Sequence, residues 1–290
     1  MTYYVKTDDE EFTKELKSEL EKKGYQEGHI PTNFVFLSGK YAYNKNLFNM
    51  KQSLLTNIVK PIKITNKLEL HKLFQNEKFI KSFIIIQKTI PKFTGLKILK
   101  PVNGFQGLGI TIVRTSEEVD KWIKNFKHKD IRDGDWLLQD YILNPALKDG
   151  HKFHLRVLVL VIDDKVYMYN KSPYYLAKTK YKLEDFHNKD IHDTHYNSNF
   201  NYFYPDVLPD EWKRKSDISK VLSTVFKGIK LKPDWNSKNS FCMYGADIMF
   251  EGHKPILLEV NDRIGLKAVK LVVSDMLDTL EGKKSNFIPI

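Results

Sequence analysis

The sequence predicts a mixed α+β protein with several lobes, because strand and helix patterns alternate along most of its 290 residues. Two pairs of strand patterns are separated only by tight turns, one at Asp163–Asp164 and one centred on His253, which indicates antiparallel hairpins. Hydrophobic residues make up 41% of the chain, as expected of a folded protein with a sizeable core. The sequence contains no internal repeat and no low-complexity linker.

Each expected element rests on a local pattern. Residues 9–23 carry apolar side chains at helical spacing, and Gly24 ends this helix. Thr115 and Glu118 form a capping box that begins another helix, over 116–127. Further helices are expected at 47–58, 66–77, 215–230 and near 266–280. Strands are expected at 33–37, 96–101, 109–114, 135–142, 152–163, 165–170 and in a hairpin over 244–261, and residues 182–212 are expected to form a long loop.

Composition limits the compartment and the partners. The net charge of +11 suggests an acidic partner such as a nucleic acid, an acidic peptide or a polyphosphate. No apolar run approaches the roughly 20 residues that span a bilayer. The acidic N-terminal stretch lacks the apolar core of a signal peptide, and the single cysteine excludes an internal disulfide. We therefore expect a cytoplasmic protein without membrane contact, in which Cys242 is a core residue.

The last predicted hairpin has one polar and one apolar face. Side chains alternate along a strand, so Glu259 and Asn261 point to the same side. A turn centred on His253 would place Asp247 opposite Glu259 and Gly245 opposite Asn261. The core face is expected to hold Ala246, Ile248, Phe250, Ile256, Leu258 and Val260.

The facing acids Asp247 and Glu259 indicate a metal site. Opposed side chains have Cβ atoms about 5 Å apart, and two carboxylates at this distance repel each other unless a cation lies between them. Mg²⁺ takes oxygen ligands and is usually held by one or two carboxylates plus substrate phosphates. The pattern therefore favours a magnesium site, with a solvated hairpin face as the alternative.

A glycine-rich turn follows Lys100 in the stretch KPVNGFQGLGI, residues 100–110. Glycines let backbone N–H groups approach an anion closely, and a lysine at a strand end adds a point charge suited to phosphate. The turn leads into a strand and not into a helix, so neither of the common phosphate-loop contexts applies. A flap over a nucleotide and an ordinary glycine-rich hairpin both remain open.

Two further stretches carry candidate binding groups. QDYI, residues 139–142, ends a strand, where it would offer backbone groups to an adenine edge or be a plain strand end. In the next long strand Lys152, His154 and Arg156 share one face, opposite an apolar face. A cationic face on a central strand indicates an anion, unless that face is open to solvent.

In order and spacing, the stretches KPxxGxxGxGI, QDYI, NPALKDGHKFHLRVLVLV, YGADIMF and ILLEVN resemble the tubulin tyrosine ligase-like family. The resemblance runs from about residue 47 to 270 and is most specific over 139–161 and 243–261. It implies the ATP-grasp fold, with ATP clamped between a central and a C-terminal lobe. It also implies an N-terminal lobe at 1–48, a central lobe at 49–136 and a C-terminal lobe at 137–290.

Residue by residue, the resemblance implies a nucleotide site and a metal site. The residues implied at the nucleotide are Lys51, Lys100, Gly104, Gly107, Gly109, Gln139, Asp140, Tyr141, Ile142, Lys152 and Thr194. Residues 139–142 would form the adenine-side hinge, and Lys100 would contact the phosphates under the glycine flap. Lys152 and Arg156 would act as catalytic residues at the reacting phosphate or carboxylate. The magnesium ligands would be Asp247, Glu259 and Asn261.

The chain departs from the family pattern at two positions that bear on the chemistry. The family has Asp at the position of His154, and an arginine that is thought to hold the reacting phosphoryl group at the position of Tyr175. Loss of a bidentate phosphate binder is not a conservative change. His195 also stands where the family's LTN motif has Asn.

The resemblance implies an ATP-dependent carboxylate–amine ligase that works through an acyl phosphate. A free amino acid would be joined to an acidic acceptor, such as a tubulin tail, which the net charge suits. Family members commonly act as monomers. The open alternatives are an ATP-grasp inositol-phosphate kinase, a non-catalytic binder of tubulin or another acidic protein, and a nucleic-acid-binding protein, the last on charge alone.

Overall fold

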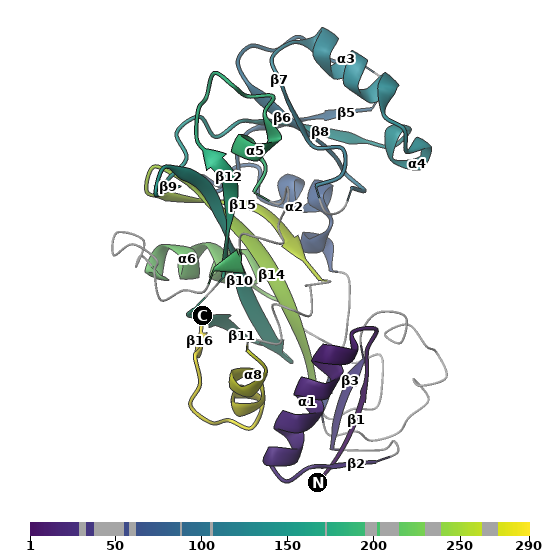
Figure 1. The fold of residues 1–290 in the computed structure, drawn as a ribbon, viewed down its shortest axis with the longest axis vertical. Helices are drawn as coiled ribbons and strands as arrows, with labels where there is room; N and C mark the ends of the chain where they lie inside the picture. Colours follow the sequence, from purple (N-terminus) through teal and green to yellow (C-terminus); the bar gives the residue numbers. More distant parts are fainter. Residues whose placement is uncertain are drawn as a thin grey trace.

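The computed structural model describes residues 1–28, 33–37, 55–57, 62–87, 89–104, 107–171, 173–194, 202–203, 215–229, 239–262 and 272–290. Within these ranges, strands and helices interleave along the chain and the strands form two separate sheets (Figure 1). The mixed α+β class predicted from the sequence is therefore confirmed. No helix in the described ranges is long and apolar enough to cross a membrane.

The larger sheet runs through the middle of the molecule (Figure 1) and unites twelve of the described strands. Its path is β13 (Tyr202–Phe203), β12 (Tyr174–Lys180), β10 (His151–Ile162), β14 (Asn239–Glu251), β4 (Leu55–Asn57), β3 (Phe34–Leu37), β1 (Thr2–Lys6) and β2 (Gln26–Glu27). Off this path lie β9 (Leu147–Lys148), β11 (Lys165–Tyr169), β15 (Lys254–Asn261) and β16 (Phe287–Pro289). Pairing is antiparallel from β13 to β14 and parallel from β14 to β2, so the N-terminal strands extend the sheet of the C-terminal half.

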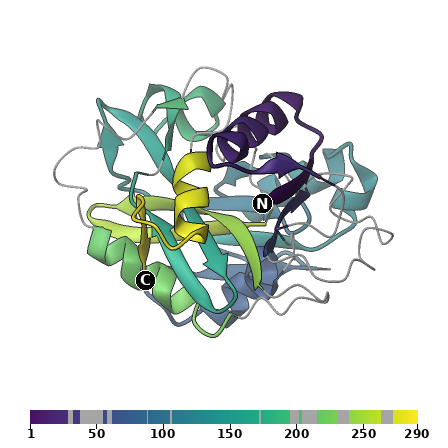
Figure 2. The same ribbon diagram turned by 90° about the horizontal axis from the view of Figure 1, so that it is seen from below.

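The two central strands of this sheet, β10 and β14, are buried on both faces along most of their length. On one face, Val159 packs in a core that includes residues of α6 (Lys215–Val225). On the other, Leu160 packs with residues of α1 (Glu10–Lys22) and α8 (Val273–Leu280), which lie side by side (Figure 2). This second face of β10 is apolar at residues 158 and 160 and polar at residues 152, 154 and 156. One end of the strand therefore belongs to the apolar core, and the other end presents buried polar side chains.

The smaller sheet lies at the opposite end of the molecule from α1 and α8 (Figure 1). Its order is β5 (Phe83–Ile86), β8 (Trp136–Asp140), β6 (Lys97–Pro101) and β7 (Thr111–Val113), all antiparallel. It packs against α3 (Ser116–Asn125), and the short α4 (Lys129–Arg132) follows α3. The helix α2 (Lys67–Leu73), which follows a 3₁₀ turn at Lys63–Thr65, contacts both sheets: Leu70 enters the large core and His71 bonds to Gln139 of β8.

Several predicted elements are confirmed together with their capping groups. Asp9 accepts a hydrogen bond from the Phe12 N–H at the start of α1, and Gly24 adopts a φ of +82° just beyond its end. Thr115 accepts from the Glu118 N–H at 3.2 Å and begins α3. Cys242 is 1% exposed and belongs to the large core, as expected.

Two sequence predictions are corrected, and some strands were not predicted. Residues 55–57, predicted as the end of a helix over 47–58, form strand β4 between β3 and β14, where neighbouring strands override a weak helical pattern. The rest of that predicted helix lies outside the described residues. The expected loop over 182–212 contains the helical turn α5 (Lys189–His192) and strand β13. Strands β1, β2, β5, β9, β12 and β16 were not predicted. The last predicted helix is seen as helix over 273–280, and residues 266–271 lie outside the described residues.

Candidate active site

The hairpin of β14 and β15 pairs the predicted acids as the sequence analysis expects. Asp247 lies opposite Glu259, and Gly245 lies opposite Asn261. The turn itself is one residue tighter than predicted, because Glu251 already pairs with Lys254 and the turn residues are 252–253. A bulge in the ladder makes up the difference and keeps the two acids in register.

The same bulge corrects the predicted apolar face of β15. Beyond it, Ile248 pairs with Leu257, which is fully buried in the large core together with Val260. Ile256 and Leu258, both predicted for that core, pack instead in a separate small cluster. Strict alternation fails here because one extra residue on β15 shifts every side chain below the bulge to the opposite face.

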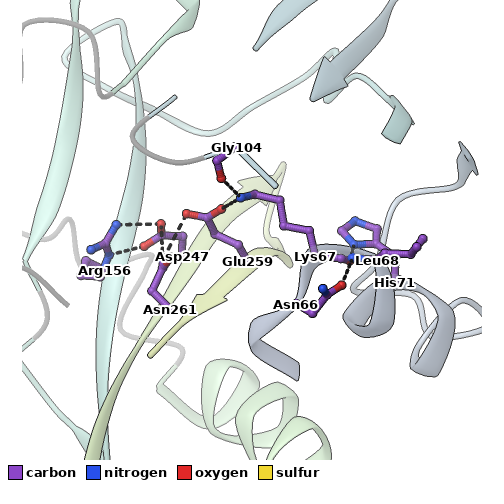
Figure 3. A network of polar contacts seen from close by, with 9 residues as sticks. All are labelled: Asn66, Lys67, Leu68, His71, Gly104, Arg156, Asp247, Glu259 and Asn261. Carbon is purple, nitrogen blue, oxygen red and sulfur yellow. Dashed lines mark hydrogen bonds and ion pairs between the residues drawn. The ribbon is translucent and has the colours of Figure 1, made fainter. Parts of the chain in front are cut away.

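Arg156 of β10 holds Asp247 in a bidentate ion pair. Its Nη2 lies 2.8 Å from Oδ2, and its Nε donates to Oδ1. Asp247 is 1% exposed, and this pairing satisfies both of its carboxylate oxygens away from water. The Asn261 amide nitrogen lies 3.1 Å from Oε1 of Glu259 and 3.4 Å from Oδ2 of Asp247 (Figure 3). The two acids, the amide and the guanidinium therefore form one polar network.

Lys67, which the sequence analysis did not identify, joins this network from α2 (Figure 3). Its Nζ donates to the Gly104 carbonyl at 2.7 Å and lies 3.5 Å from Oε2 of Glu259. Asn66 caps the helix by accepting from the N–H groups of residues 68 and 69, which fixes the first turn that carries Lys67. No local motif marks a lysine after a capping asparagine as functional, so only the tertiary structure identifies it.

The two facing carboxylates of the hairpin are oxygen donors of the kind that a magnesium ion takes. Asp247 and Glu259 present carboxylate oxygens on adjacent strands, the hard donors that Mg²⁺ prefers. Asn261 turns its amide nitrogen toward both acids, so its amide would have to rotate for its oxygen to join them. Within the described residues, no group of three or more His, Cys, Asp or Glu side chains is placed to bind a metal. Arg156 and Lys67 balance the two negative charges, so a bound cation would share these carboxylates with them.

Two buried lysines, Lys100 at the end of β6 and Lys152 near the start of β10, face this region from different sheets. Burial lowers the pKa of Lys100 to about 8, while Glu259 raises it and Lys67 lowers it. Burial also lowers the pKa of Lys152 to about 7, while Asp193 raises it and Lys100 lowers it. Since burial disfavours the charged amine, an anion bound between these lysines would stabilise both as cations.

Lys152 is held by groups that are neutral at physiological pH. Its Nζ donates to the Tyr141 hydroxyl at 2.9 Å and to the His192 carbonyl at 3.1 Å. The Tyr141 hydroxyl in turn bonds to Nδ1 of His192 at 2.7 Å. Burial first, and Lys152 second, lower the pKa of His192 to about 4, so this ring is neutral and accepts from Tyr141.

The rest of the predicted hinge is engaged in protein contacts. The Gln139 amide nitrogen donates to Nε2 of His71 at 2.9 Å, which ties β8 to α2. Asp140 forms an ion pair with Lys97, and Ile142 packs in the small cluster with Met249. The N–H groups of residues 140 and 141 already donate to the carbonyls of residues 82 and 96. The structure thus brings Tyr141 to Lys152 and turns the Gln139 side chain toward α2.

Each of the three predicted glycines of the turn has a steric or a conformational reason. A Cβ at residue 104 would lie 2.4 Å from the Pro101 ring and 3.0 Å from the Leu108 carbonyl oxygen, so only glycine fits. Gly107 has a φ of +73°, and a Cβ there would lie 3.6 Å from an Asp193 carboxylate oxygen. Gly109 also has positive φ, at +81°. Residues 105–106 of the turn lie outside the described residues.

The two departures from the family pattern are direct neighbours. His154 of β10 pairs across the ladder with Tyr175 of β12, and their rings stack with centroids 4.8 Å apart and planes 10° apart. His154 Nδ1 bonds to the Thr194 hydroxyl at 2.6 Å, which brings Thr194 to the site. The Arg156 guanidinium lies 5.5 Å from the centre of the Tyr175 ring.

The structure therefore gathers most of the predicted site residues in one region. Lys67 links the glycine turn to the acids. Lys100 lies close enough to Glu259 for the carboxylate charge to raise the lysine pKa. Lys152, His154 and Arg156 share one face of β10, as predicted. Lys51 and His195 lie outside the described residues.

Comparison with known proteins gives one family. The sequence profile described as "Tubulin-tyrosine ligase family" matches residues 41–232. The chain is 30% identical over 202 residues to mouse "Tubulin polyglutamylase TTLL6", covering 57% of this chain and 23% of that protein. It is 26% identical over 223 residues to the Caenorhabditis elegans "Probable tubulin polyglutamylase ttll-9", covering 64% and 52%.

A third relative is named as a tyrosine ligase and not as a polyglutamylase. The chain is 27% identical over 190 residues to the Schizosaccharomyces pombe "Probable tubulin--tyrosine ligase C12B10.04", covering 59% of this chain and 44% of that protein. The chain thus spans between about a quarter and a half of the length of these three relatives.

Proposed function

Because the chain belongs to the tubulin-tyrosine ligase family, we propose that it is an ATP-dependent ligase that joins an amino acid to an acidic protein acceptor. The observation that carries this proposal is the convergence of two opposed acids, Arg156 and two buried lysines at the meeting point of two sheets. Such an arrangement suits a polyanion bound together with a divalent cation. We further propose ATP-grasp lobes with boundaries near residues 48 and 136.

The proposed reaction transfers the terminal phosphoryl group of ATP to an acceptor carboxylate, giving ADP and an acyl phosphate. The amine of a free amino acid then attacks the acyl carbon, phosphate leaves, and an amide bond forms. Mg²⁺, when bound, would neutralise charge on the phosphates. No side chain of this chain has to act as a covalent nucleophile.

The roles of the chain's own residues follow from charge and position. Asp247, Glu259 and Asn261 would hold the cation, and Lys67 would lie between that site and the glycine turn. Lys100 and Lys152 would compensate phosphate charge, which returns their lowered pKa values toward the ordinary range. Charge placed in advance around a transferring phosphoryl group is the main source of rate in this class of reaction.

The acceptor is proposed from the relatives and from charge. Three relatives are named for the addition of glutamate or tyrosine to tubulin, whose acidic tails suit a chain of net charge +11. We propose that the acceptor is a tubulin tail or a similar acidic peptide, and that the donor is a free amino acid.

The experiment that tests this proposal compares wild type with Glu259→Gln. We expect turnover of ATP to require one amino acid and an acidic tail peptide together, and to fall by about two to four orders of magnitude in the variant. Mg²⁺-dependent ATP binding should weaken in parallel. The matched control is Glu251→Gln on the same hairpin, whose carboxylate pairs with Lys81 at 3.0 Å near the turn.

Three results would contradict the proposal in different ways. ATP binding without turnover under any pairing of amino acid and peptide would favour a non-catalytic binder of acidic proteins. Turnover stimulated by an inositol phosphate and not by peptide with amino acid would favour a kinase. Absence of ATP binding in wild type would exclude the nucleotide site altogether.

A further inference from the structure

The stacked rings of His154 and Tyr175 connect two parts of the proposed site. On one side, the Tyr175 ring faces the Arg156 guanidinium at 5.5 Å. On the other, His154 bonds to Thr194 at 2.6 Å, and its Nε2 lies 3.9 Å from Oδ1 of Asp247. The pair therefore contacts both members of the Arg156–Asp247 ion pair and the segment that carries Thr194.

Burial makes these contacts well defined. His154 is fully buried and Tyr175 is 9% exposed, and the two rings lie within 10° of parallel on adjacent strands. A long arginine side chain has many rotamers, and ordering it costs conformational entropy. A flat ring below the guanidinium restricts these rotamers through a cation–π contact and adds no charge to the site.

Replacing Tyr175 by the arginine of the family pattern shows why a neutral side chain at this position matters. An arginine there would place a second guanidinium beside Arg156, which forms a bidentate ion pair with Asp247 and also lies within the electrostatic reach of Glu259. Two like charges at this distance in a buried site would repel each other. A neutral ring supports Arg156 and leaves its bidentate contact with Asp247 intact.

We propose that His154 and Tyr175 are a positioning pair, which holds Arg156 and Asp247 in the geometry needed at the cation and phosphate site. The pair acts through these residues and contacts no reacting atom itself. Its effect on ligand binding rests on the proposed function, whereas its effect on Arg156 does not.

The first test measures Arg156 directly in the nucleotide-free protein. The ¹⁵N-labelled arginine Nε–H resonance of Arg156 is assigned by its loss in Arg156→Lys. We expect Tyr175→Met and His154→Gln to shift this resonance and accelerate its exchange with water at least about tenfold, because the flat support is lost. Tyr175→Phe should leave it nearly unchanged.

The matched control for this test is Tyr174→Met. Tyr174 precedes Tyr175 on β12 but packs in the large core against Phe153, on the opposite face. Its loss should lower the melting temperature without moving the Arg156 resonance. An unchanged Arg156 resonance in the folded Tyr175 or His154 variant, or an equal shift in the Tyr174 control, would overturn the proposal.

The second test measures the consequence for ligands. We expect Tyr175→Met to weaken Mg²⁺-dependent ATP binding by about tenfold while binding without Mg²⁺ changes little. Tyr175→Phe should restore wild-type affinity. If wild type binds no ATP, the proposed function fails and the resonance experiment still decides the positioning pair. If wild type binds ATP and Tyr175→Met matches the Tyr174→Met control, the positioning role at the site is wrong.

Discussion

At the residue scale, the candidate site is built from charges that are costly to bury. Lys152 is 4% exposed, and its Nζ donates to a hydroxyl and a carbonyl. Burial lowers its pKa to about 7 from an ordinary value of 10.5. A protein keeps such a side chain where its charge is needed for a ligand, and the free protein is less stable for it.

The pKa of Lys152 predicts a pH dependence of stability. Between pH 7 and 10.5 the unfolded chain binds this proton and the folded chain does not, so wild-type stability rises with pH across that window. The destabilisation caused by burying the charged Lys152 amine is complete below pH 7 and absent above pH 10.5. Lys152→Met should therefore stabilise the nucleotide-free protein by about 1–4 kcal/mol near pH 6.5, with a smaller gain at pH 9.

Urea unfolding of both proteins at the two pH values measures this difference. Lys165→Met, at an exposed lysine of β11, is the control and should change stability little at either pH. The Lys152→Met variant should also bind ATP more weakly than wild type. A variant that is less stable than wild type at pH 6.5 would show that Lys152 is already compensated in the free protein.

At the scale of single elements, α2 shows how a short helix carries a site residue. It spans only Lys67–Leu73 and cannot be stable by itself, so its cap and its tertiary contacts hold it. Asn66 supplies the cap, and His71 bonds to Gln139 of the small sheet. Since Lys67 is the first residue of this helix, the position of its Nζ depends on that cap.

Asn66→Ala should therefore affect both stability and ligand binding. Loss of the cap should lower the free energy of unfolding by about 1 kcal/mol, and ATP affinity should fall several-fold because Lys67 is less well placed. Thr115→Ala removes the equivalent cap of α3, whose hydroxyl accepts from Glu118. It should cost similar stability and leave ATP affinity unchanged, as chemical denaturation and calorimetric titration would show. Equal affinities of the two variants would argue against a role for Lys67.

At the scale of the whole molecule, the site lies where the two sheets meet. The small sheet contributes Lys100 and the glycine turn, and the large sheet contributes Arg156 and the acid pair. Lys67 contacts both, through Gly104 and Glu259 (Figure 3). A ligand bound there would be enclosed by two separately built sheets, as suits a substrate that must be kept from water.

The charge of the whole chain predicts how the proposed acidic acceptor would bind. With a net charge of +11, association with an acidic tail peptide should weaken as salt rises from 50 to 200 mM, since the screening length is about 10 Å at 0.1 M. A peptide with its glutamates replaced by glutamines should bind weakly at both salt concentrations. Fluorescence anisotropy measures both peptides. Salt-independent binding of the acidic peptide would indicate that charge does not select the acceptor.

The sequence alone determined the features that depend on local pattern. Period-two alternation placed Lys152, His154 and Arg156 on one face. The spacing within the last hairpin predicted the pairing of Asp247 with Glu259, which the structure reaches through a tighter turn and a bulge. The order of the motifs also identified the family, which the comparisons support over residues 41–232. These features could be predicted because each depends on residues that are close together in the chain or on a pattern of residue types.

Only the tertiary structure decided which distant residues meet. The parallel insertion of β4 and the contact of Lys67 with Gly104 and Glu259 involve partners far apart in sequence. The bulge that moves Leu257 into the core is local to one hairpin, but no residue pattern marked it. The stack of His154 on Tyr175 likewise follows from the register of two strands. Local propensity differs by about 1 kcal/mol or less between alternatives at such positions, so packing between elements determines the outcome.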